Sequence, residues 1–275
     1  MIRKYIFSTL ILALAMLAVS GCGKKSAEAP IKFNTVKFGD TTSFKRSNGD
    51  ICKVRVDVSV DCPVKYGNKA STEKLQKWFM SSVLESGDSI ATMEEAVKHY
   101  VAIKLGANAV DEEKSEGEDL AEESENAANK IAIAVKITAV YKSNGVLSVK
   151  KEETYKKDEV ASKYDRYCNF DLDSMKEIDQ LMFDKDMLPD LCEELKNKLM
   201  DDNDVSSSEE LNGLGFFNID NLTVTSNFYF GEEGVTWTFL PGEISAGDKF
   251  EPQVTLGYST LKKYASSNSV LDRFE

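Results

Sequence analysis

The chain has 275 residues, of which 42% are hydrophobic and 29% are charged, a composition typical of a globular protein with a sizeable core. It carries 34 Lys and Arg residues against 46 Asp and Glu residues, so its net charge is −12. This charge excludes nucleic acid as an expected partner, because affinity for nucleic acid depends on neutralising phosphates with basic groups. The single histidine, His99, excludes most histidine-based catalytic and metal sites.

The first 21 residues have the pattern of a secretory signal. Arg3 and Lys4 precede an apolar run over residues 6–19, which is shorter than the roughly 20 residues that a membrane-spanning helix needs. The order Val-Ser-Gly-Cys then leads to Cys22 and resembles the lipobox of bacterial lipoproteins. The resemblance implies cleavage before Cys22 and lipidation of that residue. A plain signal peptide followed by a chance cysteine is the alternative.

Processing at Cys22 would make residues 1–21 a lipoprotein signal peptide and residues 22–32 a tether. It would also remove two positive charges, so the net charge would change from −12 to −14. Acyl chains contribute about 0.8 kcal/mol per buried methylene, so the expected partner at this end is the membrane, reached through the lipid anchor. Gly23 stands where an aspartate would signal inner-membrane retention in some bacteria. We therefore expect a protein of the cell envelope, anchored in the outer membrane and facing the periplasm.

Four further cysteines remain, an even number that is suited to disulfides in an oxidising compartment. They are Cys52, Cys62, Cys168 and Cys192. Cys52 and Cys62 bound an alternating run, and in one extended strand they would lie about 33 Å apart. A disulfide needs Cα atoms within about 7 Å, so this pairing is excluded unless the strand folds back. Other pairings and free buried thiols stay open as alternatives.

In the first half of the chain, the sequence pattern predicts two strands and two helices. Alternation predicts strands over residues 31–38 and 52–60, each with one buried and one solvated side. Helical spacing predicts a helix over residues 71–85 and another from 93 to about 105, which follows a capping box at Thr92 and Glu95. Residues 111–129 carry nine acidic residues and are predicted to be a solvated insertion.

The second half predicts hairpins and short helices. Asn144-Gly145 separates two alternating runs, which is the strongest short-range hairpin signal. A helix with Pro189 in its first turn is predicted to end near Met200. Strands are predicted over residues 130–142, 146–157, 166–172, 222–230, 235–240 and 250–256, and a short helix over residues 258–264.

The last third of the chain resembles a known family. The resemblance rests on the aromatic hairpin at residues 228–244 and on the strand and Tyr-Ser-Thr-Leu segment at residues 250–261, with residues 169–178 as a lead-in. These segments are similar to the C-terminal domain of unknown function in RsiV-type anti-sigma factors and PdaC-type peptidoglycan deacetylases. In RsiV-type proteins this region binds lysozyme. The family's Gly-Gly-Ala-His-like loop has no counterpart in residues 154–160, and the metal-binding motifs of the deacetylase module are missing.

These observations predict an α+β fold with two packed subdomains, each an antiparallel sheet with helices on one face. Residues 33–160 are expected to form the N-terminal α+β domain, which contains the acidic insertion 111–129. Residues 161–265 are expected to form the RsiV/PdaC-like α+β domain, and residues 266–275 a tail.

The predicted function is non-enzymatic binding, with no catalytic residue, metal ligand or cofactor assigned. The predicted binding face consists of Tyr229 and Trp237 together with Glu232 and Glu233. The expected partner is a cationic protein such as a lysozyme-like muramidase, which an acidic body would attract, or cell-wall glycan such as peptidoglycan. A glycan hydrolase that uses two carboxylates and a structural or assembly lipoprotein are the alternatives.

Overall fold

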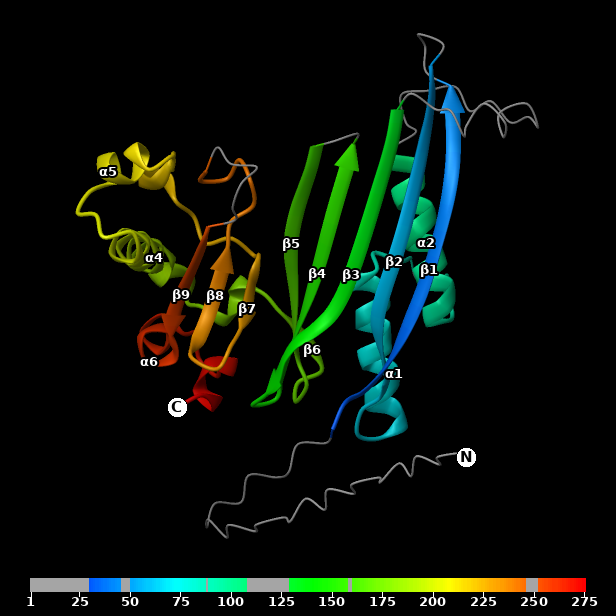
Figure 1. The fold of residues 1–275 in the computed structure, drawn as a ribbon. Helices are drawn as coiled ribbons and strands as arrows, with labels where there is room; N and C mark the ends of the chain where they lie inside the picture. Colours follow the sequence, from blue (N-terminus) through cyan, green and yellow to red (C-terminus); the bar gives the residue numbers. More distant parts are fainter. Residues whose placement is uncertain (1–29, 46–49, 88, 108–128, 158–159, 246–251) are drawn as a thin grey trace, which may run out of the picture.

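The computed structural model describes residues 30–45, 50–87, 89–107, 129–157, 160–245 and 252–275. These residues form one sheet of six strands and one of three, with helices packed against each (Figure 1). The predicted α+β fold with two packed subdomains is confirmed. Cys22 and the acidic insertion up to residue 128 lie outside the described residues.

The strands of the larger sheet follow one another across it in chain order. They are β1 (Lys32–Lys45), β2 (Ile51–Lys65), β3 (Asn129–Ser143), β4 (Val146–Lys157), β5 (Val160–Asp171) and β6 (Lys176–Ile178). Neighbouring strands are antiparallel except β2 and β3, which run parallel. We expected an antiparallel sheet, but this sheet is mixed. The helices between β2 and β3 provide the long crossover that a parallel pair of strands needs.

The described part of this crossover contains α1 (Lys69–Trp78), a π-helical turn (Phe79–Val83) and α2 (Met93–Ala107). Both helices lie beside β1 and β2, on the far side of the sheet from the second subdomain (Figure 1). The predicted capping box is confirmed. The Glu95 backbone N–H donates to Thr92 Oγ1 at 3.2 Å, and the Thr92 N–H donates to Glu95 Oε2 at 3.1 Å.

Alternation along β2 decides which side of the sheet is buried. Val54, Val56 and Val60 are fully buried beneath the helices, whereas Arg55 and Asp57 are exposed on the other side. Burial of apolar surface contributes about 25 cal/mol per Å², so the valine side supplies much of the stability of this subdomain. We call the side of the six-stranded sheet that is opposite α1 and α2 the open face.

The hairpin predicted at Asn144-Gly145 joins β3 to β4. Both residues have positive φ, 52° for Asn144 and 71° for Gly145, as a type I′ turn requires. Ser143 pairs directly with Val146, so the turn has two residues. Nearby, Tyr141 packs in the core of the second subdomain. The end of this hairpin therefore contributes to both halves of the molecule.

The smaller sheet has the order β7–β8–β9 and is antiparallel throughout. The elements of this half are α4 (Leu188–Asp202), α5 (Ser208–Gly213), β7 (Phe228–Phe230), β8 (Gly234–Thr238), β9 (Gln253–Gly257) and α6 (Tyr258–Leu261). α4 packs against β9. β7 is shorter than the predicted strand over residues 222–230, since a 3-10 turn at residues 219–221 and an irregular segment precede it.

The boundary between the two halves lies later than expected. β5 and β6 extend the six-stranded sheet past residue 160, because β5 pairs with β4 along its whole length. The smaller sheet begins only with β7.

Residues 266–275, which were expected to form a tail, pack against the folded body. Leu271 and Phe274 are 0% and 3% exposed, and the Phe274 ring stacks on that of Tyr258 with centroids 4.0 Å apart. Arg273 donates to both carboxylate oxygens of Asp171, at the end of β5, at 2.7 and 2.8 Å. This segment therefore ties the two subdomains together.

Candidate functional site

Tyr229 and Trp237, the aromatic residues of the predicted binding face, lie on opposite sides of the smaller sheet. Trp237 is fully buried and lies directly opposite Phe228 on the neighbouring strand, with ring centroids 5.9 Å apart. Tyr229 lies on the other side of the sheet, opposite Thr236. The prediction that places Trp237 on a binding face is wrong, because its strand position turns it into the core.

Glu232 and Glu233 are exposed in the turn between β7 and β8. The turn is closed by a hydrogen bond from the Gly231 N–H to the Gly234 carbonyl at 2.8 Å. Neither glutamate forms an ion pair with a residue that the structure describes. Both side chains are therefore accessible at the tip of the hairpin, whereas Trp237 is not.

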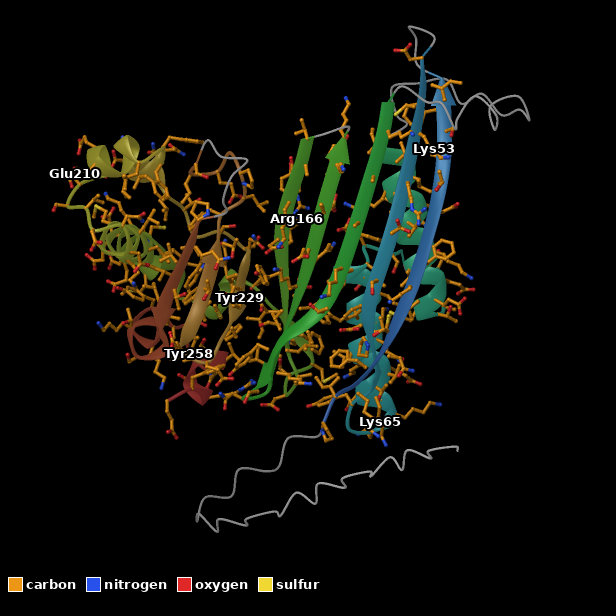
Figure 2. The ribbon with its side chains drawn as sticks, viewed as in Figure 1. Lys53, Lys65, Arg166, Glu210, Tyr229 and Tyr258 are labelled. Carbon is orange, nitrogen blue, oxygen red and sulfur yellow. The ribbon has the colours of Figure 1, made fainter. Side chains whose placement is uncertain are left out.

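Tyr229 stacks on Tyr167 of β5, with ring centroids 4.5 Å apart and planes at 27°. Both rings are partly exposed, and Figure 2 labels Tyr229 on the smaller sheet, where it belongs to β7. Tyr167 lies on the open face, opposite Lys150 of β4. The structure thus replaces the predicted Tyr229–Trp237 platform with a tyrosine pair that spans the two sheets.

Polar side chains join the edge of β7 to the open face of β4 and β5. Asn169 Nδ2 donates to the Phe228 carbonyl at 2.7 Å, and Ser148 Oγ accepts from the Phe230 N–H at 3.1 Å. Asn227, just before β7, accepts a hydrogen bond from the Tyr167 N–H at 2.9 Å. These bonds satisfy a strand edge that would otherwise be unpaired, and they fix the position of the tyrosine pair.

An open trough of about 450 Å³ lies on the open face, over β1 to β4. Its floor is low because Gly39, Ser59 and Ala134 have small or absent side chains. A Cβ atom on Gly39 would lie 2.4 Å from Asp57 Oδ1, so a larger residue would displace that carboxylate. The charged residues that line the trough are Lys37, Asp57, Lys136 and Glu152.

The two carboxylates of the trough are neutralised by neighbouring cations. Arg55 Nε donates to Asp57 at 2.6 Å, and this hydrogen bond lowers the pKa of the Asp57 carboxyl. Lys163 and Lys150 lie 2.9 and 3.2 Å from Glu152, and the hydrogen bond from Lys163 is the largest cause of the lowered pKa of Glu152. Both carboxylates are therefore ionised and paired at neutral pH.

Lys37 and Lys136 differ from these groups. Neither ammonium forms an ion pair within the described part of the chain, and both residues are exposed. Ser59 of β2 pairs with Lys37 of β1 on one side and with Lys136 of β3 on the other, so the three residues form one row across the sheet.

Cys52, Cys62, Cys168 and Cys192 are thiols in the structure. Cys52 and Cys62 both lie on β2, so one extended strand separates them as expected. Burial raises the pKa of Cys62 to about 12 and that of Cys168 to about 11. Burial also raises the pKa of Cys192. At neutral pH these three thiols are protonated and are poor nucleophiles.

No group of three metal-ligating side chains occurs within the described residues. Glu95 lies four residues before the single histidine, His99, on α2. Its carboxylate accepts the Thr92 N–H in the capping box of this helix. Among the helices of the described ranges, none is long and apolar enough to cross a bilayer.

Sequence comparison finds one family match, which lies within the second half of the molecule. Part of the chain matches the DUF3298 family model. The match covers residues 180–259, from the turn before α4 to the start of α6, and the family is described as a protein of unknown function. No curated protein matches the chain. The narrower resemblance to RsiV-type and PdaC-type proteins remains a prediction.

Two solved DUF3298 structures are similar to this chain. A DUF3298 family member from Bacteroides fragilis NCTC 9343 has a TM-score of 0.69 at 16% identity, with 90% of this chain and 98% of that chain covered. A DUF3298 family protein from Pseudomonas aeruginosa PAO1 has a TM-score of 0.51 at 11% identity, with 88% and 96% covered. At these identities the similarity shows the fold, which therefore extends beyond the DUF3298 region itself.

Sequence reasoning missed Tyr167 and the row of Lys37, Ser59 and Lys136. A signal was available in the alternation of each strand, which places these residues on the solvated side. The order of the strands, which brings them together, has no local signal of that kind.

Proposed function

We propose that the protein is a lipid-anchored module of the cell envelope that binds cell-wall glycan without modifying it. The observation that supports the binding role is the polar trough on the open face. Tyr167, which stacks on Tyr229, lies on the same face opposite Lys150, two residues before the trough residue Glu152 on β4. Sites for small polar ligands combine a concavity, aromatic surface and a few placed polar groups. The proposed anchor rests on the signal pattern that ends at Cys22, and the proposed outer-membrane location rests on Gly23.

The charges of the trough support binding rather than hydrolysis. A glycoside hydrolase with two carboxyl groups needs one of them to be protonated, and its pKa is raised for that purpose. The trough carboxylates, Asp57 and Glu152, both have lowered pKa values because cations donate to them. Neither is suited to donate a proton to a glycosidic oxygen at neutral pH.

A cationic muramidase is the second candidate partner. The observation in its favour is the exposed pair of Glu232 and Glu233 at the hairpin tip, in a chain of net charge −12. Opposite charges accelerate the encounter of two proteins and make it sensitive to salt.

The test is sedimentation of the full chain, purified in detergent, with insoluble peptidoglycan. We expect the wild-type protein to sediment and to release no soluble sugar, and we expect Tyr229→Ala to weaken binding about tenfold through loss of its aromatic contact. Phe217→Ala is the matched control, since Phe217 is also a partly exposed aromatic residue but lies away from the trough lining.

Four results would contradict the proposal or redirect it. Soluble sugar release would establish a hydrolase. Absence of sedimentation would remove glycan as the ligand, and salt-sensitive inhibition of a muramidase would then favour the second candidate. Mass spectrometry of the mature chain tests the anchor, because an unmodified Cys22 would refute it.

A further inference from the structure

The row of Lys37, Ser59 and Lys136 brings two cations and a hydroxyl to one margin of the trough. Adjacent strands lie about 4.8 Å apart, so the Cα atoms of the two lysines are separated by about 10 Å, with Ser59 between them. Both lysines line the trough, and their side chains are long enough to meet above the Ser59 hydroxyl. Three donor groups can therefore converge on one small group in the trough.

The two lysines of this row differ from the carboxylates of the trough in having no ion-pair partner among the described residues. The two carboxylates that line the trough, Asp57 and Glu152, are paired with Arg55 and with Lys150 and Lys163. Within the described part of the chain, the charges of the trough that lack an ion-pair partner are those of Lys37 and Lys136, both positive. The trough is thus locally cationic on a chain whose overall charge is −12.

We propose that Lys37, Ser59 and Lys136 form the binding site for a carboxylate group of the ligand. The ligand class is then an acidic cell-wall saccharide, in which a sugar or its attached peptide carries the carboxylate. This inference rests on the proposed function and narrows it. Each carboxylate oxygen accepts charge-assisted hydrogen bonds, which are shorter and stronger than bonds between neutral groups. The tyrosine pair lies farther along the same face, next to Lys150, and is placed to contact the sugar rings.

The experiment measures binding of two soluble probes to the full chain by calorimetry. One probe is a disaccharide-tetrapeptide from peptidoglycan, which carries carboxylates, and the other is a neutral N-acetylglucosamine oligomer. We expect the acidic probe to bind at least tenfold more tightly. Lys37→Gln and Lys136→Gln should each weaken its binding about tenfold, while binding of the neutral probe stays unchanged. Ser59→Ala should act in the same direction with a smaller effect.

Lys65→Gln is the matched control, because Lys65 is an exposed lysine at the far end of β2, away from the trough (Figure 2). Thermal unfolding of each variant shows whether the fold is retained, and exposed Lys→Gln changes are expected to leave it intact.

The outcomes separate the two proposals. If both probes bind equally well, or if the lysine variants bind the acidic probe as the wild type does, the carboxylate site is refuted while glycan binding stands. If neither probe nor insoluble peptidoglycan binds, both proposals are refuted.

Discussion

The contact between Asp171 and Arg273 should make the stability of the fold depend on pH, which can be tested. Asp171 is 8% exposed and accepts hydrogen bonds from Arg273, Ser174 and the Asp173 N–H. Burial opposes ionisation, but these hydrogen bonds outweigh it and lower the pKa of Asp171 from 3.8 to about 2. A difference of this size corresponds to about 2 kcal/mol of folding free energy.

Because the pKa of Asp171 is lower in the folded chain than in the unfolded chain, its contribution to stability decreases as the pH falls. The carboxylate contributes its full stabilisation above pH 3.8, where it is ionised in both the folded and the unfolded chain. That contribution is lost as the pH falls from 3.8 through 2, because the unfolded chain takes up its proton first. We therefore expect Asp171→Asn to lower the free energy of unfolding by about 2 kcal/mol at pH 7, and by roughly half as much at pH 3.

The assay is urea unfolding followed by tryptophan fluorescence, with wild type and variant compared at each pH. Glu73→Gln is the control. Within the described part of the chain, Glu73 forms one ion pair, with Lys69, and this pair is exposed, so the substitution should cause no measurable change at any pH. A difference between wild type and Asp171→Asn that stays constant from pH 7 to pH 3 would show that ionisation of Asp171 is not linked to folding.

Three further predictions concern the interior. Phe274→Ala should lower the free energy of unfolding by about 3 kcal/mol in the same urea assay, since it removes a buried ring, and a change under about 1 kcal/mol would refute the packed position of this segment. Asn169→Leu leaves the Phe228 carbonyl without its donor and should cost about 2 kcal/mol, whereas unchanged stability would mean that water replaces the amide. Cys62, with a pKa raised to about 12, should resist iodoacetamide at pH 8 until urea unfolds the chain, and rapid labelling of the native protein would contradict its burial.

Local patterns predicted those parts of the fold that depend on neighbouring residues in the chain. The hairpin at Asn144-Gly145 and the capping box at Thr92 and Glu95 are both present, because each is a short-range arrangement with its own hydrogen bonds or backbone angles. The buried side of β2 also followed from alternation.

Arrangements between distant segments could not be predicted in this way. The parallel pairing of β2 and β3 depends on how the helical crossover packs, and periodicity does not report it. Alternation separated Tyr229 from Trp237 but did not say which of the two sides was buried. Tyr167 became part of the candidate site only because β7 lies against β5, and that contact is made by the side chains of Asn169 and Asn227.

The docking of Phe274 has a consequence for the order in which the chain can fold during synthesis. Its ring stacks against those of Tyr258 and Phe230 and lies near Tyr141, more than a hundred residues earlier in the sequence. A growing chain that emerges amino end first can form the Asn144 hairpin early, yet it cannot close the aromatic cluster around Tyr141 until residue 274 is available. The nascent protein must therefore pass through a stage in which the aromatic cluster around Tyr141 is still exposed to solvent.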